Sequence, residues 1–164
     1  HSTDYQPYNI LRQLVENNFK FLKVGPELTY YYSRSLFFME KIEKKLFIKD
    51  KSFFKHNIYN LMIKNKKYWL SYFRNSNKKI LLESKLDRMR YYLNEKKSIQ
   101  SIRNLKKNIN SISLKEIINF LSKDQKKDFI SYNKKNLSNF ENIKMIFISR
   151  SLIRYYLACG YKIK

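Results

Sequence analysis

The chain has 164 residues and a formal net charge of +22, because 35 Lys and Arg residues face only 13 Asp and Glu residues. Its hydrophobic content of 43% and aromatic content of 16% exclude a simple disordered basic tail. A chain of this length has room for one hydrophobic core rather than two. We therefore expect a single domain over residues 1–164, with an extended N-terminal arm at 1–7 and a short basic tail at 160–164.

Residue usage also bears on origin and compartment. Lys, Asn, Ile, Phe and Tyr are abundant and Gly and Pro are scarce, which is typical of an AT-rich genome. Codon bias does not account for the small number of acidic residues, so the charge imbalance requires a functional explanation. The single cysteine, Cys159, cannot form an internal disulfide. No stretch reaches the roughly 18 uncharged apolar residues needed to cross a bilayer.

The first strong boundary along the chain is Gly25-Pro26, which follows the apolar segment from Tyr8 to Val24. Glycine followed by proline predicts a turn and then a helix start. From Glu27 to Lys49 the apolar residues recur at steps of three and four, the helical period. A further helical run begins at Phe53. The sequence thus predicts two amphipathic helices after the first apolar segment.

An aromatic and basic stretch follows at residues 66–74, and Asn75 to Asn77 predict a loop after it. Trp69, Tyr72 and Phe73 have helical spacing, so we interpret these rings as core rather than as a stacking platform for bases. From Lys78 the apolar spacing predicts one helix that continues to Leu93. Residues 98–110 contain many Asn, Ser and Lys residues, and we expect a short or loosely held helix there.

Two capping-box patterns mark later helix starts. Ser113 with Glu116, and Ser138 with Glu141, place a Ser three residues before a Glu. The first pattern predicts a helix that extends toward residues 129–130, and the second a helix with Met145, Ile148, Leu152, Tyr156 and Cys159 on one face. Gly160 is a natural C-terminal cap. The sequence therefore predicts an all-α fold, a single irregular helical domain of about five to seven helices with basic extended or loop segments.

Basic clusters recur along the whole chain, which is the distribution expected of a protein surrounded by polyanion. Lysine and arginine side chains bind nucleic acid chiefly through phosphate. The sequence predicts RNA contacts at a set of basic residues distributed from the second expected helix onward: Lys44, Lys45, Lys66, Lys67, Arg74, Lys78, Lys79, Arg88, Arg103, Lys106, Lys107, Lys134 and Lys135.

Catalytic motifs are absent from the sequence. Two histidines and one cysteine do not supply the closely spaced ligands of a zinc site. The carboxylate pairs Glu40 with Glu43 and Asp124 with Asp128 lie among lysines, so we interpret them as local charge balance. There is no glycine-rich phosphate loop. We therefore expect no catalytic residues, no cofactor, no metal and no small-molecule substrate.

A short match near the N-terminus offers another interpretation. Arg12, Leu14 and Glu16 resemble the R-x-L-x-E export element of malaria-parasite proteins. The resemblance implies export into the host cell and cleavage after Leu14. Leu11, Leu14 and Val15 also suit the buried face of a first helix, so the structural interpretation stays open beside it.

Charge, size and the absence of catalytic motifs lead to one functional prediction. We expect a non-catalytic, RNA-binding component of a ribonucleoprotein, an accessory protein of a mitochondrial ribosome from an AT-rich genome. Its partners would be ribosomal RNA and neighbouring ribosomal proteins in the organellar matrix, with a presequence already removed. The alternatives are an accessory subunit of a mitochondrial inner-membrane complex and an exported parasite helical interaction protein.

Overall fold

A computed structural model describes residues 3–46, 48–73, 77–133 and 136–162. These residues contain eight α-helices, one 3-10 helix and no strand, so the all-α prediction is confirmed. The helix number exceeds the five to seven expected because two spans predicted as single helices are divided. The elements are α1 (Tyr8–Glu16), α2 (Pro26–Lys45), α3 (Phe54–Lys64), α4 (Lys78–Glu83), η1 (Arg88–Tyr92), α5 (Lys96–Ser111), α6 (Leu114–Phe120), α7 (Lys123–Asn133) and α8 (Asn139–Ala158).

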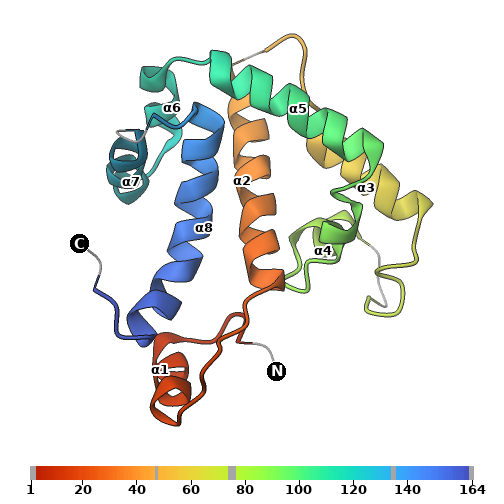
Figure 1. Cartoon of the computed structure of the whole chain (residues 1–164). Helices are drawn as coiled ribbons and strands as arrows, with labels where there is room; N and C mark the ends of the chain where they lie inside the picture. The colour runs from red at the N-terminus through yellow and green to blue at the C-terminus, as the bar shows by residue number, and fades with distance from the viewer. Residues whose placement is uncertain (1–2, 47, 74–76, 134–135, 163–164) are drawn as a thin grey trace.

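The two longest helices, α2 and α8, form the centre of the fold and run antiparallel to each other (Figure 1). Helix α5 crosses near their upper ends and contacts α2, α3 and α8. Helix α1 packs against the C-terminal end of α8, and α7 packs along its side. Helices α3 and α4 lie on the opposite side of α2, where they meet each other and η1. This arrangement leaves α2 flanked on both sides.

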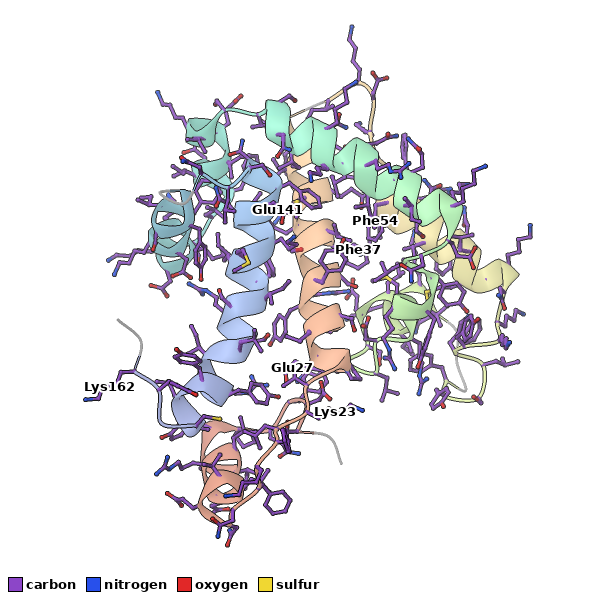
Figure 2. All side chains as sticks on the ribbon, viewed as in Figure 1. Lys23, Glu27, Phe37, Phe54, Glu141 and Lys162 are labelled. Carbon is purple, nitrogen blue, oxygen red and sulfur yellow. The ribbon has the colours of Figure 1, made fainter. Side chains whose placement is uncertain are left out.

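The main core lies between α2, α3, α5 and α8. Figure 2 shows Phe37 of α2 and Phe54 of α3 facing each other, with ring centroids 5.7 Å apart. Trp69 is 1% exposed, and its indole Nε1 donates a 2.7 Å hydrogen bond to the Met62 carbonyl. The interpretation of Trp69 as core is therefore confirmed. Tyr72 differs from it, because 53% of its surface is exposed.

The sequence predicts helix ends correctly where the signal depends only on neighbouring residues. Pro26 is the first residue of α2. Ser113 accepts from the Glu116 backbone N–H, and the Glu116 side chain accepts from the Ser113 backbone N–H. Ser138 accepts from the Glu141 N–H at the start of α8. Gly160 adopts φ +87° just after α8, the left-handed conformation that favours glycine at this position.

The helix expected from Lys78 to Leu93 is wrong as a single element. Helix α4 ends at Glu83, and the chain turns before it enters η1. Asp87 takes φ +45° at this turn, and Thr29 of α2 donates a hydrogen bond to its carboxylate. A tertiary contact thus interrupts an apolar spacing that would suit a continuous helix.

The segment expected to be a short or loosely held helix is instead a sixteen-residue helix, α5. Two of the polar residues that suggested weakness, Ser101 and Asn108, are buried and hydrogen-bonded. Ser101 accepts a 2.9 Å hydrogen bond from the Asn57 side chain. Asn108 donates 2.6 Å to the buried Glu43 carboxylate and 2.7 Å to the Asp50 carbonyl. These side chains fix α5 against α2 and α3.

The face of α8 predicted from its spacing exists but does not form the core. Met145, Ile148, Leu152 and Tyr156 line an open groove of about 710 Å³ together with α7 residues. Phe140, Ile143 and Ile146 on another face of α8 belong to the main core. Helix α8 is apolar on more than one face, so its periodicity does not by itself identify the buried one.

Candidate functional site

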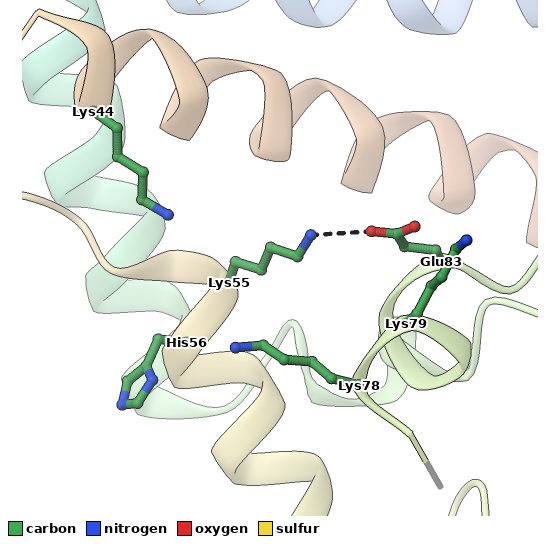
Figure 3. A pocket seen from close by; sticks show the side chains of 6 residues that line it. All are labelled: Lys44, Lys55, His56, Lys78, Lys79 and Glu83. Carbon is green, nitrogen blue, oxygen red and sulfur yellow. Dashed lines mark hydrogen bonds and ion pairs between the residues drawn. The ribbon is translucent and has the colours of Figure 1, made fainter. Parts of the chain in front are cut away.

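A basic pocket of about 450 Å³ lies beside α2, between α3 and α4 (Figure 3). It is open on one side, and its walls carry mostly cationic side chains. Six residues from three helices line it: Lys44, Lys55, His56, Lys78, Lys79 and Glu83. We call this feature the basic pocket. Four further hollows of the described residues have at most two lysines each.

Local sequence places each lining side chain. Lys44 stands in the last turn of α2. Lys55 and His56 follow Phe54 at the start of α3, which begins after Phe53 takes the left-handed conformation. Asn77 caps α4 by accepting a 2.8 Å hydrogen bond from the Ile80 N–H. Of the two lysines that begin α4, Lys78 extends toward α3 and Lys79 extends beside Glu83 (Figure 3).

Glu83 is the carboxylate among the side chains that line the basic pocket. Lys55 Nζ lies 3.0 Å from Glu83 Oε1, and this hydrogen bond is the main reason that the pKa of Glu83 falls below its usual value. Lys79 and Arg34 lower the same pKa through their positive charge. The lining thus holds four lysines against one glutamate. The buried Glu40 partners Lys44 at 3.5 Å from just outside the lining, and cations still exceed carboxylates by two.

Aromatic rings beside the pocket hold two of its ammonium groups. Lys55 Nζ lies 5.0 Å from the centre of the Phe37 ring, and the Arg34 guanidinium contacts the same ring at 4.6 Å. Lys78 Nζ lies 5.1 Å from the Tyr59 ring. Such cation–π contacts restrict long side chains that would otherwise sample many rotamers. The cations therefore face the pocket from partly fixed positions.

The predicted basic residues are spread over the molecule, and only Lys44, Lys78 and Lys79 meet at one cavity. Lys106 of α5 pairs with Glu141 at 3.7 Å. Arg103 and Lys107 line two different hollows beside α5. The exposed residues Lys45, Lys66 and Lys67 lie at or beyond the ends of α2 and α3. Arg74, Lys134 and Lys135 lie outside the described residues.

Several cations are engaged within the protein itself. The Arg88 guanidinium lies 3.2 Å from the centre of the exposed Tyr72 ring. Lys67 Nζ lies 5.6 Å from the Tyr68 ring, and Tyr68 stacks on Tyr91 at 5.0 Å. The aromatic and basic stretch thus folds on itself, and its rings are covered in part by the protein's own charges.

Sequence reasoning missed Lys55, His56 and Glu83. His56 Nε2 lies 2.9 Å from the Asn60 side-chain nitrogen one helical turn away. Glu83 is the one acidic residue that follows the lysines of α4 on a short helix, yet nothing in the sequence relates it to Lys55, which is 28 residues earlier. Contacts between α2, α3 and α4 create the site, and these are tertiary.

Neither a metal-binding cluster nor a membrane-spanning helix is present among the described residues. No group of three or more His, Cys, Asp or Glu side chains is arranged to hold a metal ion within residues 3–162, gaps aside. None of the helices in the described part of the chain combines the length and the hydropathy needed to span a bilayer.

Comparison with known proteins connects this helical fold to a family. A family model described as D-tagatose-1,6-bisphosphate aldolase subunit GatZ/KbaZ-like matches residues 1–160. The chain belongs to the GatZ/KbaZ-like family. The D-tagatose-1,6-bisphosphate aldolase subunit GatZ of Escherichia coli O6:K15:H31 is 32% identical over 118 residues, 70% of this chain and 28% of that protein. GatZ of Salmonella newport matches with the same identity and coverage.

The chain therefore spans about 28% of the length of these curated GatZ relatives. A solved structure extends the likeness over nearly the whole chain. The crystal structure of a probable tagatose 6 phosphate kinase from Sinorhizobium meliloti has a TM-score of 0.79 and 26% sequence identity to it. That match covers 97% of this chain and 42% of the solved chain. The GatZ/KbaZ-like helical fold is thus present in a structure solved independently.

Membership of the GatZ/KbaZ-like family overturns the functional prediction. An RNA-binding component of a mitochondrial ribosome is wrong, and so are both alternatives, because the family is described by a subunit of a sugar-bisphosphate aldolase. The expectation of no enzyme role is wrong on the same finding. Ribosomal RNA and ribosomal proteins are wrong as partners. The mitochondrial location is also wrong, because it followed from the ribosome and the relatives are bacterial proteins.

The structure gives physical reasons for these errors. The charge of +22 is a sum over the chain, and many of its cations contact the protein's own rings and carboxylates. The residues of the expected export element are structural as well. Arg12 and Glu16 form a 2.8 Å ion pair along α1, and Arg12 Nη1 donates 3.2 Å to the Ala158 carbonyl of α8.

Proposed function

We propose that the chain is the helical part of a subunit of a sugar-bisphosphate aldolase, with a role in the turnover of phosphorylated tagatose. The observation that carries the proposal is the family match over residues 1–160. The names of the matching proteins and of the solved structure share one class of small molecule, tagatose that carries phosphate.

The electrostatics of the chain are consistent with this proposal. A phosphate ester carries close to two negative charges at neutral pH, about −1.5 to −2. A strongly cationic protein raises the local concentration of such an anion and speeds its arrival. The net charge of +22 therefore favours an anionic substrate such as a sugar bisphosphate.

The test uses the protein in the cells that make it. We would isolate it through an affinity tag, together with the proteins that accompany it, and assay D-tagatose 1,6-bisphosphate as substrate. Aldol cleavage at the middle of the carbon chain gives two triose phosphates, which a coupled dehydrogenase assay detects. We expect triose phosphate release from the isolated material and none from cells that carry the tag alone.

Two outcomes would overturn the proposal. The first is isolated material that does not cleave the bisphosphate. The second is ATP-dependent phosphorylation of tagatose 6-phosphate without cleavage, which would associate the chain with the activity named for the solved structure instead.

A further inference from the structure

We infer that the basic pocket binds the phosphate group of a phosphorylated ketose. The sugar identity rests on the proposed function, whereas the phosphate rests on the pocket itself. None of the comparisons assigns a ligand to Lys44, Lys55, Lys78 or Lys79.

The first argument is uncompensated charge. Within the described residues, Lys78 and Lys79 have no carboxylate within ion-pair distance. Crowding of like charges opposes folding. The fold nevertheless brings these two lysines to the same small cavity as Lys44 and Lys55. A bound dianion would reduce this repulsion, because it supplies negative charge among the lysines that line the pocket.

The second argument is preorganisation. Lys55 is held by Glu83 and by the Phe37 ring, and Lys78 is held over the Tyr59 ring. Side chains that are already restricted lose less entropy when a ligand arrives. Ammonium groups also suit phosphate as point charges that can donate several hydrogen bonds. Figure 3 shows the Lys55 and Lys78 side chains extending into the space between α3 and α4.

The third argument is size. The basic pocket measures about 450 Å³, and small-molecule sites fall between about 300 and 1,000 Å³. A hexose phosphate is a small molecule of this class, whereas a polymer needs a groove that continues along the surface. The lining therefore favours one phosphate ester.

Glu83 predicts the direction in which a substitution should change the affinity for phosphate ligands. Its carboxylate accepts a hydrogen bond from Lys55, so an incoming phosphate competes with Glu83 for the same ammonium group. Glu83→Gln removes the competing charge and keeps a hydrogen-bonding side chain of the same size. This variant should bind phosphate ligands more tightly than the natural protein, which a merely structural ion pair would not produce.

The experiment is calorimetric titration of the purified protein at constant ionic strength. The probes are D-tagatose 1,6-bisphosphate, inorganic phosphate and unphosphorylated D-tagatose. We expect binding of the bisphosphate, weaker binding of inorganic phosphate and none of D-tagatose. The paired variant Lys78→Gln with Lys79→Gln should weaken binding by about tenfold or more, the effect of losing at least one charged hydrogen bond.

The chain offers a matched control. Lys96 and Lys97 begin α5 as Lys78 and Lys79 begin α4, and both are exposed and lie outside the basic pocket. Lys96→Gln with Lys97→Gln makes the same change of net charge, and it should alter the affinity by less than about twofold. Equal losses in the two paired variants would overturn the inference, because they would indicate a general field effect.

Circular dichroism of each variant checks that the helices are retained. If the Lys78 and Lys79 pair fails to fold, Lys44→Gln tests the same pocket from the exposed end of α2 and should weaken binding several-fold. A natural protein that binds no bisphosphate overturns the inference even if the isolated material cleaves it. Binding without cleavage overturns the proposed function and leaves the site in place.

Discussion

Helix α2 borders two regions that hold charge in opposite ways. At its N-terminal end Glu27 is fully buried and completely surrounded by partners. Arg154 of α8 forms an ion pair with it, the Tyr155 hydroxyl donates at 2.7 Å, and the Tyr5 backbone N–H donates at 2.6 Å. Figure 2 places Glu27 where α2 approaches α1 and the end of α8. We call this group of four residues the basal junction.

The basic pocket toward the C-terminal end of α2 has the reverse character. Its lysines are mostly exposed, exceed the available carboxylates and surround a cavity instead of filling one. Buried charge that is fully paired holds segments together, because each missing partner would leave an unsatisfied group. Exposed charge around a cavity contributes little to folding and is available to a ligand. The charges of the basal junction therefore stabilise the fold, whereas those of the basic pocket are available to a ligand.

The largest expected effect comes from breaking the basal junction. Glu27→Ala leaves Arg154 without its carboxylate in a partly buried position, and it removes an acceptor from Tyr155 and from the Tyr5 backbone. Removing one partner of a buried ion pair costs about 3–5 kcal/mol. Urea denaturation should show this loss in the free energy of unfolding.

An exposed ion pair provides the control for Glu27. Glu16→Ala removes the partner of Arg12 on α1, where the Glu16 side chain is 56% exposed. Exposed pairs contribute about 0–1 kcal/mol. A loss at Glu16 as large as that at Glu27 would contradict the distinction between buried and exposed charge drawn here.

A third carboxylate, Asp87, accepts a hydrogen bond from Thr29 of α2 and makes stability depend on pH. Burial raises its pKa from 3.8 to about 6, although the hydrogen bond from Thr29 and the charges of Arg90 and Arg34 oppose the rise. Because the folded pKa lies above the unfolded one, folding favours the protonated acid. Its contribution to stability is complete below about pH 4 and is lost as the pH rises through about 6.

Asp87→Asn should remove this pH dependence. Asparagine tolerates the left-handed backbone at this position, where φ is +45°. The variant should match the natural protein near pH 4 and exceed its stability near neutral pH by up to about 3 kcal/mol, the value of a shift of about two pKa units. Denaturation across this pH range measures the difference. A difference that stays constant with pH would show that Asp87 does not titrate as its burial implies.

Local signals in the sequence predict much of the fold but little of the site. Pro26, Ser113 and Gly160 act through their own backbone neighbours, so each marks a helix end without knowledge of the tertiary structure. The turn at Asp87 depends on Thr29, which is 58 residues away. The Lys55 contact with Glu83 is likewise tertiary. Summed charge predicts an anionic partner without specifying which one, and the choice of ribosomal RNA is wrong.

The smallest expected change in the free energy of unfolding is at the basic pocket, and the direction of that change is informative. Without ligand, Lys78→Gln with Lys79→Gln should change the free energy of unfolding by about 0.5 kcal/mol or less, as is usual for exposed positions. The change should be a gain in stability, because the substitutions relieve like-charge repulsion. With D-tagatose 1,6-bisphosphate at about 100 times the natural Kd, the natural protein should gain about 2.7 kcal/mol. A tenfold weaker variant should gain only about 1.4 kcal/mol. Thermal unfolding with and without the bisphosphate checks both values. A large loss in the absence of ligand would show that these lysines, like Glu27, belong to the architecture of the fold.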